Sequence, residues 1–108
     1  MLEAAREILE FMKGVNYHQF SSQKILRYAV ERQIIAIGEA AKRVSDTFKN
    51  VHPEIPWGGM VGQRNVLAHE YGEILLERIW LVATEYIPKL IPLLTTLIPP
   101  LPDNNRGK

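Results

Sequence analysis

Apolar side chains recur every three or four positions at the beginning of the chain, which is the spacing of one helix face. Five residues show this spacing: Leu2, Ala5, Ile8, Leu9 and Met12. Because Gly14 follows as a natural stop, the pattern predicts a short helix over residues 2–13. The next stretch, VNYHQFSS, is expected to be a connection in which Ser21 or Ser22 caps the following helix.

A longer pattern of the same kind predicts one continuous helix over about residues 23–49. Its main stripe steps by threes and fours: Leu26, Val30, Ile34, Ile37, Ala41, Val44 and Phe48. Further apolar residues widen this surface: Ile25, Ala29, Ile35, Ala36 and Ala40. A surface wider than one stripe predicts a helix buried on two sides, against its own bundle and against a second copy of the chain in a homodimer.

Two neighbouring residues stand out from this pattern. Gly38 costs about 1 kcal/mol relative to alanine inside a helix, so its presence predicts a close packing contact. Glu39 follows directly, and two alternatives are open for it. It belongs either to a solvated or ion-paired face together with Glu31, or to a surface buried against a partner chain.

Prolines and glycines interrupt the helical patterns in the second half of the chain. The stretch NVHPEIPWGG, residues 50–59, is predicted to be a loop that Ile55 and Trp57 anchor in the core. A third helix is expected over about residues 60–69, with Gly72 as its stop.

The last helix is predicted to start near Glu73, and Pro88 and Pro92 are expected to kink or break it. Since no strand pattern occurs, the expected fold is all-α, a small bundle of four to five helices. A single helical domain would cover residues 1–98, followed by a loose proline-rich tail over residues 99–108.

Composition narrows the classes of function. The absence of cysteine excludes disulfides, thiol nucleophiles and cysteine-ligated zinc. His18 and His52 show no ligand-like spacing to each other or to His69, so neither a metal site nor another cofactor is expected. A net charge of +1 gives little long-range attraction for polyanions, so a nucleic-acid contact would need a local patch. With no signal-peptide pattern and no uninterrupted apolar span, the protein is expected to be soluble and cytoplasmic.

The stretch GQRNVLAHEYGE, residues 62–73, concentrates polar side chains that a buried helix does not need. Five residues separate Arg64 from His69, which places them about 140° apart on a regular helix. The helix is therefore expected to end near Ala68, so that the ring of His69 reaches back toward Arg64 and Tyr71 projects beside them.

An arginine and a histidine held together suit phosphodiester chemistry. A guanidinium holds phosphate oxygens bidentately, and an imidazole with a pKa of about 6.5 moves protons at neutral pH. If the ribose 2′-OH of an RNA is the nucleophile, no metal is required. The plainer alternative is that each residue is a helix cap, a surface ion pair or a half-buried packing residue.

The segment RNVLAHEY resembles the Arg-x4-His-x-Tyr signature of the HepT-like toxins in the HEPN superfamily. The stretches AVERQIIAIGEAAKRVS and IPW are also similar to that family, in the same order and spacing. One departure is FSSQK, which has no acidic residue where relatives often carry an aspartate.

The resemblance implies a homodimeric helical bundle and a metal-independent endoribonuclease that acts on RNA. By position, Arg64 and His69 become catalytic, Asn65 becomes a supporting polar residue, and Tyr71 becomes the site where AMP is added. The implied partner is a nucleotidyltransferase antitoxin of the MNT type, which silences the toxin by this modification. The alternative is a non-catalytic HEPN module that binds a nucleotide or serves as a scaffold for such a partner.

Overall fold

The computed structural model describes residues 1–67 and 72–97, and these residues form an all-α fold without strands. The elements in chain order are α1 (Leu2–Met12), α2 (Tyr17–Ser22), α3 (Lys24–Arg43), α4 (Asp46–Val51), α5 (Trp57–Leu67), α6 (Gly72–Leu81), the π-helical turn η1 (Val82–Tyr86) and α7 (Ile87–Thr95). The predicted helical bundle is confirmed.

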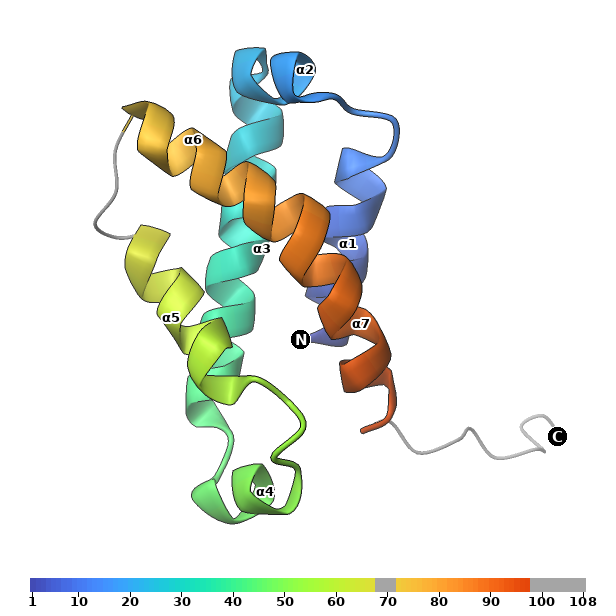
Figure 1. Ribbon diagram of the computed structural model, residues 1–108, viewed down its shortest axis with the longest axis vertical. Helices are drawn as coiled ribbons and strands as arrows, with labels where there is room; N and C mark the ends of the chain where they lie inside the picture. The colour runs from blue at the N-terminus through green and yellow to red at the C-terminus, as the bar shows by residue number, and fades with distance from the viewer. Residues whose placement is uncertain (68–71, 98–108) are drawn as a thin grey trace, which may run out of the picture.

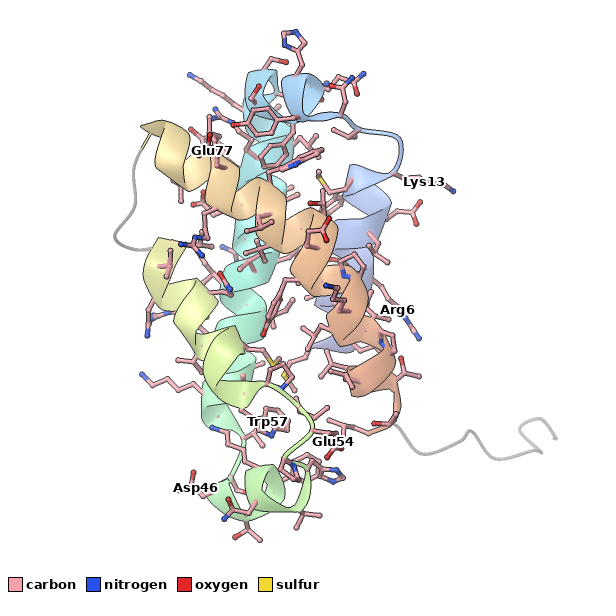
Figure 2. The ribbon with its side chains drawn as sticks, in the orientation of Figure 1. Arg6, Lys13, Asp46, Glu54, Trp57 and Glu77 are labelled. Carbon is pink, nitrogen blue, oxygen red and sulfur yellow. The ribbon has the colours of Figure 1, made fainter. Side chains whose placement is uncertain are left out.

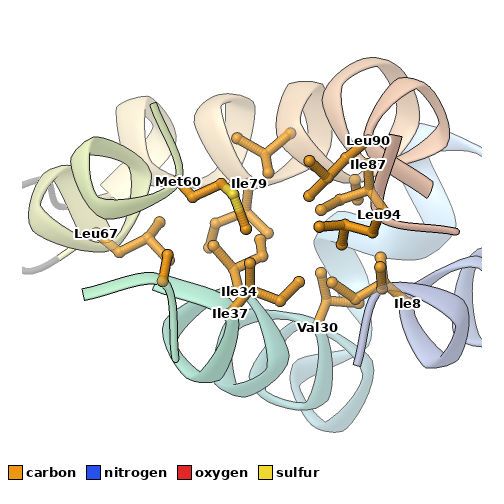
Figure 3. Packing of buried hydrophobic residues seen from close by; sticks show 14 of the residues in the cluster. Ile8, Val30, Ile34, Ile37, Met60, Leu67, Ile79, Ile87, Leu90 and Leu94 are labelled. Atoms are coloured by element: carbon orange, nitrogen blue, oxygen red, sulfur yellow. The ribbon is translucent and has the colours of Figure 1, made fainter. Parts of the chain in front are cut away.

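The long helix α3 is the centre of the bundle (Figure 1). Helices α1 and α5 pack along α3, while the C-terminal run of α6, η1 and α7 crosses it and packs on α1. Between these elements lies a single hydrophobic core (Figure 3). In it, Met60 and Leu67 of α5 lie near Ile34 and Ile37 of α3, so α5 presents one of its faces to the core.

The predicted continuous helix over residues 23–49 is wrong, because it ends at Arg43 and a new helix starts at Asp46. Val44 has extended backbone angles, and the Ser45 hydroxyl accepts a hydrogen bond of 3.1 Å from the backbone N–H of Phe48. A serine hydroxyl offers the backbone this alternative to the helical ladder. The apolar spacing runs through the break and therefore did not reveal it.

The stretch predicted to be a connection contains helix α2. Asn16 and Gln19 form a capping box, in which each side chain accepts a hydrogen bond from the other residue's backbone N–H, at 2.8 and 2.9 Å. Phe20 is fully buried and fixes the helix on the core. The predicted serine cap is wrong: Ser21 and Ser22 donate back to carbonyls within α2, and the N-cap of α3 is the residue after them.

Both predicted anchors of the loop before α5 are confirmed, since Ile55 and Trp57 are buried. Figure 2 labels Trp57 at the start of α5. The indole N–H of Trp57 donates to the carbonyl oxygen of His52 at 3.0 Å. Helix α5 nevertheless begins at Trp57, three residues earlier than predicted, so two glycines lie inside its first turn. Helix α6 begins at Gly72, which was predicted to be a stop.

The last helix is not broken at its prolines. Pro88 lies in the first turn of α7, and Pro92 lies inside that helix. Just before them, the backbone N–H of Ile87 donates to the carbonyl of Val82, five residues back, in the π-helical turn. Because proline has no N–H to continue the ordinary ladder, this wider turn lets the chain stay helical to Thr95.

Residues 98–108 lie outside the described residues, so a domain over 1–98 with a loose tail over 99–108 stays a prediction. Within the described part, none of the helices combines the length and the apolar character that a membrane span requires.

Candidate functional site

Arg64 lies on α5 at a point where this helix packs closely against α3. Gly38 is buried on α3 directly opposite, and a methyl group added there would overlap the Cβ atom of Arg64. The same methyl group would lie 3.0 Å from the carbonyl oxygen of Met60. This contact is the packing reason that the sequence predicted for Gly38. It places the base of the Arg64 side chain against the surface of α3.

The side chain of Arg64 lines a groove between α3 and α5 with a volume of about 400 Å³. Three cationic side chains and one carboxylate border this groove: Arg64, Lys42, Arg43 and Glu39. The site is thus a local cationic patch on a chain whose net charge is only +1. Such a patch attracts a phosphate group over a short range.

The guanidinium of Arg64 has two polar neighbours. Its Nη2 lies 3.7 Å from Oε2 of Glu39, and its Nη1 donates to Oδ1 of Asn65 at 3.2 Å. The side chains of Arg64 and Glu39 are 37% and 46% exposed, so water screens the ion pair and its contribution to stability is small. Of the two alternatives for Glu39, the structure of the single chain shows the ion-paired one.

The guanidinium of the partly exposed Arg64 has five N–H donors, so donors remain available beyond these two contacts. An arriving phosphate can therefore bind to Arg64 while Asn65 holds the guanidinium in place. Arg64 and Asn65 are the two predicted site residues that the structure brings together. The predicted roles of both remain predictions at this point.

His69 and Tyr71 lie outside the described residues, which end at Leu67 in α5 and resume at Gly72. The expected approach of the His69 ring to Arg64 therefore stays a prediction. So does the expected position of Tyr71 beside them.

Sequence reasoning missed Lys42 and Arg43 as parts of this site. They occupy the last turn of α3, one turn beyond Gly38 and Glu39. The spacing i, i+1, i+4 and i+5 places these four residues along one side of the helix. That spacing was visible in the stretch GEAAKR, but only the contact of Gly38 with α5 shows which side faces Arg64.

Of the remaining candidates, those among the described residues do not gather into a second polar site of this kind. The ring of His52 packs at a tilt against Phe48 with centroids 4.5 Å apart, and its Nδ1 lies 3.4 Å from Oε2 of Glu54. Within residues 1–67 and 72–97, no group of three acidic, histidine or cysteine side chains could hold a metal ion. Trp80 packs against Tyr17 and Phe20 at centroid distances of 5.4 and 5.6 Å.

Comparison with known proteins places the chain in a family. The family model described as Ribonuclease HepT-like matches residues 1–97. The candidate RNase MJ1380 of Methanocaldococcus jannaschii is 39% identical over 90 residues, which are 83% of this chain and 83% of that protein. "Probable ribonuclease HepT" of Thermococcus cleftensis is 38% identical over 88 residues, 82% of this chain and 80% of that protein. No solved structure matches the chain. The chain therefore belongs to the HepT-like ribonuclease family.

Proposed function

We propose that the protein is the toxin of a type VII-like toxin–antitoxin pair and cleaves RNA without a metal ion. The observation that carries this proposal is the cationic groove between α3 and α5, with Arg64 at its edge and Asn65 bonded to the guanidinium. Membership of a ribonuclease family supports it. In the proposed reaction Arg64 and His69 are the catalytic residues, and Asn65 positions Arg64.

The chemistry follows from these two side chains. His69 accepts the proton of the ribose 2′-OH, whose oxygen attacks the adjacent phosphorus. Arg64 stabilises the negative charge that develops on the phosphate oxygens. The bond from phosphorus to the 5′ oxygen then breaks, and that oxygen takes up a proton. The products are a 2′,3′-cyclic phosphate and a free 5′-hydroxyl.

We propose further that the protein is a homodimer that uses the outer faces of α3 and α5. Two large apolar residues of α3 face outward: Ile25 is 86% exposed and Tyr28 is 60% exposed. On α5, Gly62 has open space where a side chain would be, so a second chain can approach closely at the middle of this helix. In such a dimer the two copies of Arg64 would face one shared cleft for RNA.

Replacing Ile25 by arginine is expected to convert the dimer to a monomer without unfolding it, because the side chain is almost entirely exposed in the single chain. Light scattering should then report a mass near 12.4 kDa for the variant and twice that for the unaltered protein. Val51 on α4 is also exposed and apolar, so Val51→Arg is the matched control and should remain dimeric. A monomeric unaltered protein would contradict the dimer.

The proposed regulator is an MNT-type nucleotidyltransferase that adds AMP to Tyr71. The added group brings a phosphate and a base close in sequence to Arg64, where the negative charge competes for the guanidinium and repels RNA. Modification is therefore expected to inhibit cleavage by blocking the groove, without unfolding the bundle. In cells, the partner would relieve the growth arrest that the toxin causes.

Incubation with the cognate nucleotidyltransferase and ATP should raise the mass of the protein by one or more AMP units. Peptide mass spectrometry is expected to locate the addition on Tyr71, and Tyr71→Phe should remain unmodified. The matched control is Tyr28→Phe, which removes a hydroxyl from an exposed tyrosine on α3 and should still be modified. Modification of another residue, or none, would exclude Tyr71 as the switch.

A further inference from the structure

Among the described residues that line the groove of Arg64, Glu39 brings the only carboxylate. Its Oε2 lies 3.7 Å from Nη2 of Arg64, the guanidinium that binds the phosphate in the proposed function. A carboxylate at this position repels every anion that reaches Arg64. The proposed reaction uses the cations of the groove and gives this carboxylate no part, so its presence needs a physical reason.

The ion pair with Arg64 does not supply that reason. Both side chains are partly exposed, so water screens their attraction. At 3.7 Å the contact is also longer than an N–H···O hydrogen bond, whose usual length is at most about 3.2 Å. The guanidinium has a hydrogen bond to Asn65 instead. Glu39 therefore contributes little to the fold or to the position of Arg64.

The packing of the two helices keeps this carboxylate beside Arg64. The preceding residue, Gly38, lies so close to α5 that an added methyl group would overlap the Cβ atom of Arg64. The backbone of α3 at Glu39 is thereby fixed relative to the base of the Arg64 side chain. The negative charge of Glu39 therefore stays in the groove next to a bound phosphate, whether or not the ion pair persists.

Phosphate groups reach such a groove with two different charges. A phosphodiester inside an RNA strand carries one negative charge. A terminal phosphate, such as that of AMP, carries nearly two at neutral pH because its second pKa is about 6. Coulomb repulsion grows in proportion to charge, so Glu39 costs a dianion about twice the binding free energy that it costs a diester. The factor by which Glu39 weakens the affinity is therefore squared for a dianion.

We propose that Glu39 is a charge filter, which favours the internal phosphodiesters of RNA over phosphate dianions, an inference that rests on the proposed function. The anions that it disfavours are free nucleotides, inorganic phosphate and strand ends with a terminal phosphate. Arg64, Lys42 and Arg43 attract these anions as well as RNA, so without the carboxylate they would compete more strongly for the groove. AMP attached to Tyr71 would escape the filter, since its phosphate links a tyrosine to a ribose and carries a single charge.

The binding of two matched ligands tests this proposal: AMP and its methyl ester, adenosine 5′-methylphosphate, which differ by one charge. Each ligand displaces a labelled 2′-O-methyl RNA, which has no free 2′-OH to attack the phosphorus, and fluorescence anisotropy measures the displacement. Glu39→Gln should tighten binding of the methyl ester about threefold and binding of AMP about tenfold, because the squared factor applies to the dianion. Glu39→Asp keeps the charge, so both affinities should stay close to those of the unaltered protein.

Glu10→Gln is the matched control, because it removes the same charge from an exposed position of α1, on the other side of α3 from α5 (Figure 1). Salt screens a charge at that distance, so both affinities should stay within about twofold of their original values.

Three outcomes would overturn the filter. If Glu39→Gln tightened AMP and its ester by the same factor, the carboxylate would only compete for Arg64. If both ligands bound more weakly, Glu39 would serve to position the guanidinium. If neither ligand displaced the RNA from the unaltered protein or from Glu39→Gln, the groove would not bind phosphate groups as proposed. None of these measurements requires cleavage, so the filter can be confirmed in a protein that cuts no RNA, and equal tightening would leave the proposed function intact.

Discussion

Replacing Arg64 by alanine is expected to reduce RNA cleavage at least 10²- to 10³-fold, because the transition state loses its main positive charge. The rest of the protein should be unaffected. Arg64 is about one-third exposed, and its ion pair with Glu39 is screened by water, so the variant should fold and melt like the unaltered chain. Initial rates on a fluorescent RNA, measured beside a thermal melt, separate lost chemistry from lost structure.

His69→Ala should lose activity to a similar extent, because His69 is the proposed proton carrier. In the unaltered protein, cleavage should continue in EDTA and leave 2′,3′-cyclic phosphate ends. These ends form only when the ribose itself attacks the phosphorus. Rates that collapse on chelation, or products with 5′-phosphate ends, would contradict the metal-independent reaction.

Removing one positive charge at a time separates the cations that bind RNA in the groove from those elsewhere on the protein. Arg43→Gln removes a charge that borders the groove but has no part in the proposed reaction, so it should raise KM and weaken the salt dependence while leaving kcat near its original value. Lys13→Gln removes a charge from the C-cap of α1, on the far side of the bundle from α5 (Figure 2), and should change neither constant. No cleavage by the unaltered protein would favour the alternative of a non-catalytic HEPN module. Full cleavage in Arg64→Ala would instead contradict the catalytic role of Arg64.

The fold was predictable where apolar spacing and local turn signals agree. The spacing located α1 and the central part of α3, and the buried Ile55 and Trp57 were recognisable as apolar residues between prolines. The apolar spacing failed to predict the structure where a single side-chain hydrogen bond determines the backbone conformation. The Ser45 hydroxyl caps a new helix just after α3, and the capping box of Asn16 and Gln19 starts α2. Neither of these caps changes the spacing of the apolar residues. The π-helical turn was hidden for the same reason, since it changes one bonding register and leaves every residue helical.

The candidate site was predictable only in part. A guanidinium and an imidazole five residues apart draw attention because a buried helix needs neither, so Arg64 was identifiable from its own segment. Its surroundings were not, because Glu39 and Lys42 come from α3 and reach Arg64 only through the packing of two helices.

Replacing Gly38 by valine is expected to destabilise the protein by about 3 kcal/mol, the upper part of the usual range for overpacking. Two obstacles meet the new side chain. One is the Cβ atom of Arg64, which is fixed to the backbone of α5, and the other is the carbonyl oxygen of Met60 at 3.0 Å from the added Cβ. Neither belongs to the end of a flexible side chain, so α5 as a whole must move away from α3. The small gain in helix propensity over glycine, well under 1 kcal/mol, does not offset this.

A thermal melt followed by circular dichroism should show Tm lowered by roughly 10–20 °C for Gly38→Val, given the sensitivity of small domains. Gly58→Val is the matched control. Gly58 lies in the first turn of α5, and nothing is within 4 Å of the position that its Cβ would take, so the Tm of this variant should stay close to that of the unaltered protein. If the two variants melted alike, the close approach of α3 and α5 would be wrong. Because that approach also seats Arg64 in the groove, Gly38→Val should in addition lose cleavage below its melting temperature, whereas Gly58→Val should keep it.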